Sequence, residues 1–263
     1  MKKDAIHNLR RVFVWQLPVR IYHWLNALVI MVLIVTGFYI GDPLALNSHK
    51  DASSQFTMGW MRMIHFIAAY IFLFNFLFRI YWGFAGNKYA NWRQFIPTNK
   101  SFFKGFWQVL KIDILMMKGK EPLNVGHNPV AGMSYFVLFI AFIVQVFTGF
   151  GLYAGMSDSF IANLFGWVPA LTGGDILLRS IHHWAMWIFI LFTVVHVYLV
   201  LYHDYVEGRG EVSSMFGGWK FIEEEVFDEA EERKYGKMKM VIPATEKIEV
   251  EKIPEKSPDT DIA

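Results

Sequence analysis

The sequence predicts an all-α membrane protein in which four transmembrane helices form a bundle, with a short amphipathic interfacial helix in one connecting loop. Composition is the first observation: 54% of residues are hydrophobic, 17% are aromatic and only 18% are charged, against about a quarter charged in soluble domains. The second is four segments with the ~20 predominantly apolar residues that a spanning helix needs. The third is the recurrence of histidine inside those segments, where ionisable side chains are costly.

The four apolar segments define the predicted helices. Because backbone groups inside lipid must be satisfied within the segment, each should be helical rather than extended. Tryptophan and tyrosine lie near the segment ends, as expected for aromatic belts at the membrane interfaces. The predicted spans are residues 21–41, 58–84, 130–153 and 177–203.

A fifth segment, residues 102–117, mixes large apolar side chains with Lys104, Lys111 and Asp113. Those charges disfavour spanning, so an amphipathic helix lying on the membrane surface is expected.

Lysine and arginine alternate between the loops. The segment before the first span carries five, residues 42–57 carry one, residues 85–129 carry seven and residues 156–176 carry none. This positive-inside pattern predicts a multi-pass membrane protein with both termini in the cytoplasm. The net charge of +2 gives no indication of a nucleic-acid partner.

The chain divides into a membrane domain, residues 1–222, and a charged tail, residues 223–263. The tail holds 13 acidic and seven basic residues, a composition that predicts a disordered cytoplasmic segment. The complete absence of cysteine excludes disulfides, iron–sulfur clusters, thiolate zinc sites and covalently attached c-type haem.

The histidines of the last span form a regular pattern. His182 and His196 are 14 residues apart, which returns them to nearly one helix face, offset by roughly 40°, with a rise of about 21 Å. One imidazole should therefore lie near each side of the membrane. His183 is rotated by about 100° from that face and is expected to have a supporting or structural role.

Depth in the membrane pairs the histidines of different spans. His65 should lie level with His182 near the outer side, and His23 level with His196 near the inner side. Two imidazoles facing each other in a helical bundle provide the axial ligands of a six-coordinate haem b. The pattern therefore predicts two haem b groups per chain, whereas zinc or copper would lack further ligands at either pair.

Other residues near these depths have two interpretations. Gly37, Gly149 and Gly151 could leave room for a flat macrocycle, or could allow close helix packing. Four arginines lie at helix ends, where they could pair with haem propionates as bidentate donors or act as interfacial anchors. They are Arg62 and Arg179 at the outer ends and Arg20 and Arg79 at the inner ends.

Several motifs resemble the cytochrome b subunit of membrane-bound nickel–iron uptake hydrogenases, a family of di-haem cytochromes b. The resemblance covers roughly residues 12–220, although P-x-R-x-x-H-W alone is shared by a wider group of bacterial di-haem cytochromes. The motifs are Pro18-Val-Arg-Ile-Tyr-His-Trp24, Thr36-Gly-Phe-Tyr-Ile-Gly41, Met58-Gly-Trp-Met-Arg-Met-Ile-His65, Arg79-Ile-Tyr-Trp-Gly-Phe-Ala-Gly-Asn87, Gly126-His-Asn-Pro129, Thr148-Gly-Phe-Gly-Leu-Tyr153, His182-His-Trp-Ala-Met-Trp187 and His196-Val-Tyr198.

The resemblance implies an anchor in the bacterial inner membrane for the small and large subunits of a periplasmic hydrogenase. The chain would accept electrons from the partner's iron–sulfur clusters and reduce membrane quinone, with no hydrogen-cleaving site of its own. It also implies that the haem ligands are His23, His65, His182 and His196.

Candidates for the quinone site or for proton delivery are His127, Asn128 and His203. The segment around His127 could equally be the entry turn of the third span, with Pro129 in the first helical turn.

Two alternatives to this function remain open from the sequence. One is the haem b anchor of another quinone-linked enzyme, such as formate dehydrogenase. The other is a small transporter or a purely structural anchor, which would purify without colour.

Overall fold

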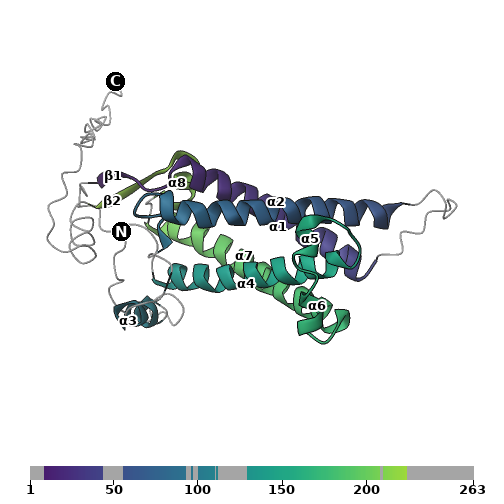
Figure 1. Ribbon diagram of the computed structural model, residues 1–263. Helices are drawn as coiled ribbons and strands as arrows, with labels where there is room; N and C mark the ends of the chain where they lie inside the picture. The colour runs from purple at the N-terminus through teal and green to yellow at the C-terminus, as the bar shows by residue number, and fades with distance from the viewer. Residues whose placement is uncertain are drawn as a thin grey trace, which may run out of the picture.

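A computed structural model describes residues 9–43, 56–92, 96, 100–109, 111, 129–207 and 210–223. Four of its helices are long and apolar enough to cross a membrane, and they run side by side along the molecule (Figure 1). The predicted membrane fold is therefore confirmed. The four helices are α1 (Leu17–Gly41), α2 (Thr57–Ala85), α4 (Pro129–Ala154) and α7 (Asp175–Glu207).

The helix ends lie within a few residues of the predicted ones. α1 begins before the predicted residue 21, with a proline in its first turn, where the missing N–H and fixed φ are favourable. α4 likewise begins at Pro129, as the entry-turn interpretation predicts. α7 continues to Glu207, past the predicted end at residue 203, because helical hydrogen bonding does not require an apolar environment.

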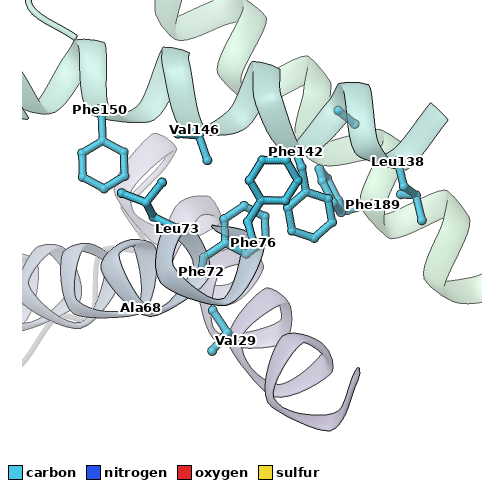
Figure 2. Packing of buried hydrophobic residues seen from close by; sticks show 11 residues of the cluster. Val29, Ala68, Phe72, Leu73, Phe76, Leu138, Phe142, Val146, Phe150 and Phe189 are labelled. Atoms are coloured by element: carbon cyan, nitrogen blue, oxygen red, sulfur yellow. The ribbon is translucent and has the colours of Figure 1, made fainter. Parts of the chain in front are cut away.

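Aromatic side chains fill the middle of the bundle. α1 packs along α2 and α4 along α7, and further contacts join α1 to α7 and α2 to α4. The ring of Phe142 stacks on Phe72, with centroids 4.4 Å apart, and on Phe76 at 5.1 Å; Phe189 completes the group at 5.2 Å from Phe142 (Figure 2). Stacked and edge-on aromatic pairs add to the stabilisation from close packing.

A small two-stranded sheet, which the sequence did not predict, covers one end of the bundle. β1 (Leu9–Phe13) pairs antiparallel with β2 (Trp219–Glu223), with Leu9 opposite Glu223 and Phe13 opposite Trp219. The short helix α8 (Glu211–Gly217) leads into β2, and Figure 1 shows all three elements at the same end. We call this the strand-side end.

Side-chain amides fix the strand-side end to α2. The side-chain oxygen of Gln16 accepts hydrogen bonds from Trp82 Nε1 at 3.2 Å and from the Asn87 backbone N–H at 3.0 Å. Asn87 in turn donates from Nδ2 to the carbonyl of Val14 at 2.9 Å. These bonds hold the start of α1 against the end of α2.

The opposite end of the bundle carries α5 (Phe160–Asn163) and α6 (Val168–Leu171), which belong to the segment that connects α4 to α7 (Figure 1). We call this the loop-side end. The hydroxyls of Tyr70 and Ser159 lie 2.7 Å apart and join α2 to this connection. Phe165 packs its ring on Phe147 at 5.1 Å and on Phe150 at 5.5 Å. The connection is thereby folded back onto the bundle.

The predicted interfacial helix corresponds to α3 (Lys100–Val109). It begins slightly before the predicted residue 102, and residues 112–117 lie outside the described part of the chain. Its position on a membrane surface stays a prediction. The predicted tail lies outside the described residues except for Glu223, which belongs to β2.

A buried ion pair gives a test of the strand-side end. Nζ of the buried Lys220 lies 2.6 Å from one carboxylate oxygen of Glu211 and 2.8 Å from the other. Glu211→Ala should destabilise the protein by about 3 kcal/mol, because it leaves a buried ammonium without its partner. Thermal unfolding of the purified protein in detergent should show a lower Tm.

The control is the double variant Lys220→Met with Glu211→Leu, which replaces the pair by apolar side chains of similar volume and should recover most of the lost Tm. If the single variant Glu211→Ala were as stable as the parent protein, this account of the strand-side end would be wrong.

Candidate functional site

The loop-side end brings two of the predicted ligands into similar hydrogen-bonding environments. Nδ1 of His65, on α2, lies 2.8 Å from the hydroxyl oxygen of Thr36 on α1. Nδ1 of His182, on α7, lies 2.8 Å from the hydroxyl oxygen of Thr148 on α4. Both imidazoles are half-buried, and His182 is close enough to His65 to interact with it electrostatically.

One glycine makes room for these rings, and a second contacts them. A Cβ atom added at Gly149 would stand only 3.0 Å from Cε1 of His182. One added at Gly37 would stand 3.6 Å from Cε1 of His65 and 3.8 Å from Sδ of Met186, which is ordinary van der Waals contact. One added at Gly151 would stand 3.0 Å from Cβ of Val168, so the role of Gly151 is close packing rather than accommodation of an imidazole.

The strand-side end brings together the other two predicted ligands. The rings of His23 on α1 and His196 on α7 have centroids 6.2 Å apart and planes at 59°. With metal–imidazole bonds of about 2.0–2.1 Å and ~1.2 Å from nitrogen to ring centre, two imidazoles on opposite sides of one metal have centroids about 6.4 Å apart. The spacing of this pair therefore fits axial ligation of a single iron.

Two buried polar atoms at the strand-side end have no hydrogen-bond partner among the described residues: Nδ1 of His23 and Nε of Arg20. The guanidinium of Arg20 donates from another nitrogen to the carbonyl of Phe216 in α8. Trp24 holds α8 in the same place, donating from Nε1 to Met215 at 3.2 Å. An unsatisfied guanidinium N–H beside a histidine pair fits a haem whose propionates supply the missing acceptor.

The other three predicted arginines differ in their environments. Arg79 donates to the carbonyl of Ala90 at 3.2 Å, which anchors the turn that follows α2. Arg62 and Arg179 are exposed near the loop-side end. Pairing of any of the four arginines with propionates stays a prediction.

The remaining histidines are not part of the two predicted pairs, and some lie outside the described residues. His183 is exposed and its ring meets Phe38 edge-on at 6.0 Å. His203 is half-buried near the strand-side end, with its ring 5.5 Å from Tyr202. His127 and Asn128 lie outside the described residues.

Each pair supplies only two side-chain ligands. Within the described ranges, no group of three or more His, Cys, Asp or Glu residues could hold a metal ion. A bare zinc or copper ion would need ligands beyond either pair, whereas a haem supplies four nitrogen ligands itself.

Thr36 and Thr148 are the residues that the sequence analysis missed as part of the site. Their signal in the sequence is a repeated Thr-Gly-Phe triplet, at residues 36–38 in the first span and 148–150 in the third. In each case the threonine contacts a histidine of the next transmembrane helix, His65 after the first triplet and His182 after the second.

Comparison with known proteins gives a consistent result. A family model described as prokaryotic cytochrome b561 matches residues 14–218. Two relatives are named "Probable Ni/Fe-hydrogenase B-type cytochrome subunit", and a third, from Escherichia coli, is named "Probable Ni/Fe-hydrogenase 1 B-type cytochrome subunit". The Cupriavidus necator protein is 36% identical, covering 81% of this chain and 88% of the relative. The Azotobacter vinelandii protein is 35% identical, covering 85% and 94%, and the Escherichia coli K12 protein is 35% identical, covering 81% and 92%.

Single histidine substitutions should separate the two sites. His65→Ala or His182→Ala should remove one haem b and His23→Ala or His196→Ala the other, because each substitution deletes one of the two side chains predicted to bind that haem. Redox difference spectra of the purified variants, quantified as pyridine haemochrome, would measure each loss. His183→Ala is the matched control beside His182 and should retain both haems; loss of haem in this control alone would refute the ligand assignment on α7.

Proposed function

The chain belongs to the prokaryotic cytochrome b561 family, and on that premise we propose that it is the membrane-anchoring di-haem cytochrome b subunit of a nickel–iron hydrogenase. In this proposal it passes electrons from the iron–sulfur clusters of a periplasmic partner across the membrane to quinone. The names of its relatives support assignment to a hydrogenase rather than to another respiratory enzyme.

The observation that carries the proposal is the approach of His23 and His196, whose ring centroids lie 6.2 Å apart on a four-helix membrane bundle; we propose His65 and His182 as the second pair. His182 and His196 are 14 residues apart on the continuous helix α7, which separates the pairs by about 21 Å along the helix. When bound, a haem b at each pair supplies a one-electron carrier whose iron alternates between the ferric and ferrous states. Two carriers at these depths span most of the ~30 Å hydrocarbon layer.

The chain's own residues hold these groups. His65 and His182 ligate at the loop-side end, and His23 and His196 ligate at the strand-side end. Gly149 keeps side-chain bulk away from the His182 imidazole. At the other end, Arg20 offers its unsatisfied Nε–H to a propionate.

The loop-side end is the proposed docking surface for the hydrogenase small subunit. Residues 156–176 carry no lysine or arginine. Phe160, Trp167 and Leu171 are 78%, 51% and 74% exposed, and apolar and aromatic side chains of this kind are enriched at the centre of protein interfaces. Phe165, in the same connection, packs inward on the bundle.

The proposed direction of electron flow follows from this orientation. Each hydrogen molecule oxidised by the partner gives two electrons and two protons on the periplasmic side. The two electrons enter at the loop-side pair and leave at the strand-side pair. There a quinone takes up both electrons, together with two cytoplasmic protons, to become a quinol.

Residues near the strand-side end could deliver those protons. His203 lies on α7 beyond His196. We propose it, together with His127 and Asn128, as a candidate for the quinone site or the proton path. The orientation with both termini in the cytoplasm rests on the distribution of lysine and arginine.

Reconstitution into proteoliposomes tests this function. With the hydrogenase outside and quinone in the bilayer, hydrogen should make the vesicle interior negative and alkaline. Two charges cross inward per hydrogen molecule, each worth about 2.3 kcal/mol per 100 mV of potential. A potential-sensitive dye and an internal pH indicator would follow both changes.

A protonophore should abolish the potential without stopping quinone reduction. His196→Ala should allow haem reduction by hydrogen at the loop-side pair but stop quinol formation. Full quinone reduction without a membrane potential would mean that the quinone site is on the periplasmic side, and would contradict the proposed route.

A further inference from the structure

Threonine hydroxyls contact both loop-side histidines in the same way. Oγ1 of Thr36 lies 2.8 Å from Nδ1 of His65, and Oγ1 of Thr148 lies 2.8 Å from Nδ1 of His182. Each threonine belongs to one helical hairpin and contacts the histidine of the other helix in that hairpin, α1 with α2 and α4 with α7. The two hairpins thus provide equivalent hydrogen-bonding partners to the ligands of one site.

The direction of these hydrogen bonds follows from the backbone. Thr36 Oγ1 lies 2.7 Å from the carbonyl oxygen of Val32, and Thr148 Oγ1 lies 2.6 Å from that of Val144. Two oxygens approach this closely when a hydrogen lies between them, and a carbonyl can only accept. Because a hydroxyl has one hydrogen, Thr36 donates it to the backbone and accepts a hydrogen bond from Nδ1–H of His65.

This direction sets the tautomer of the imidazole. A neutral ring carries one N–H, which the threonine holds at Nδ1. Nε2 is then unprotonated, and its lone pair is available to bind a metal. A hydrogen-bond acceptor at Nδ1, the nitrogen that does not bind the metal, also raises the basicity of a ligating imidazole.

The strand-side pair lacks an equivalent partner at His23, whose Nδ1 is buried without a hydrogen-bond acceptor among the described residues. His196 instead stacks on Phe192, with centroids 5.2 Å apart and planes at 12°. The two sites therefore differ in how their ligands are supported.

We propose that Thr36 is a positioning residue that strengthens His65 as an iron ligand, so that the loop-side haem has the lower midpoint potential of the two. A more basic axial ligand stabilises the ferric form relative to the ferrous form, because it donates more electron density to the metal. Electrons would then move spontaneously from the loop-side to the strand-side site. The inference rests on the proposed di-haem function.

Thr36 gives the cleaner test. At His182 the side-chain amide nitrogen of Gln145 donates to Nδ1 at 2.8 Å in the amide orientation that satisfies both of its ends, so Thr148 does not alone fix the tautomer of that ring. Thr36→Val keeps the shape of the side chain but removes the acceptor, and Thr36→Ser restores the hydroxyl. Thr193→Val is the matched control, since Thr193 donates in the same way to an i−4 carbonyl, that of Phe189 at 2.7 Å.

The measurement is an optical redox titration of the purified, haem-loaded full chain, combined with low-temperature EPR of the ferric haems. The loop-side haem is identified as the one lost in His65→Ala. In Thr36→Val we expect the lower midpoint potential to rise and its EPR signal to shift, while the other haem is unchanged. Thr36→Ser should return close to the parent values, and Thr193→Val should change neither haem.

Several outcomes would overturn the inference. One is a parent protein whose loop-side haem has the higher potential. Another is unchanged potentials in Thr36→Val with both haems present. If Thr36→Val loses the loop-side haem, retention of that haem in Thr36→Ser supports the role of the hydroxyl, and its loss in Thr36→Ser contradicts it. A parent protein without haem would instead refute the proposed function itself.

Discussion

An imidazole inside an apolar bundle needs a partner for each of its two ring nitrogens, because an unsatisfied polar group in a low-dielectric environment is costly. His23, His65, His182 and His196 all face this constraint. In the loop-side pair, threonine hydroxyls contact Nδ1, and the remaining nitrogen of each ring is the ligand atom that we propose for the iron. In the strand-side pair, Nδ1 of His23 is buried without a partner among the described residues.

The rest of the fold can be understood as support for these two sites. Between the two sites, the aromatic cluster around Phe142 joins α2, α4 and α7 and holds these helices at fixed spacing. At the strand-side end, α8 fixes Arg20 and Trp24 through backbone carbonyls. At the loop-side end, Phe165 and Ser159 attach the α5–α6 connection to the bundle, and Phe160 and Leu171 are left exposed.

Local sequence patterns predicted the four long helices, because about 20 apolar residues in a row admit few other structures in lipid. The spacing of His182 and His196 similarly predicted two depths, since helical geometry alone relates residues of one helix. The meeting of His23 with His196 depends on contacts between α1 and α7, yet the matched depths indicated it correctly.

Other features could not be predicted from local patterns. The pairing of β1 with β2 joins residues more than 200 positions apart in two five-residue strands, and neither strand is long enough to be distinctive. The roles of Thr36 and Thr148 depend on which histidine the neighbouring helix brings into contact with each threonine. Arg20 and Arg62 look alike in the sequence, but α8 covers only the first; Arg62 is exposed.

The central claim is that the chain holds two non-covalent haem b groups, each between two histidines. A pyridine haemochrome assay on the purified chain, normalised to protein by amino-acid analysis, tests it most directly. The account predicts two protohaems per chain, both extracted by acidic acetone. One haem per chain, no haem, or haem that remains attached to the protein after extraction would contradict it.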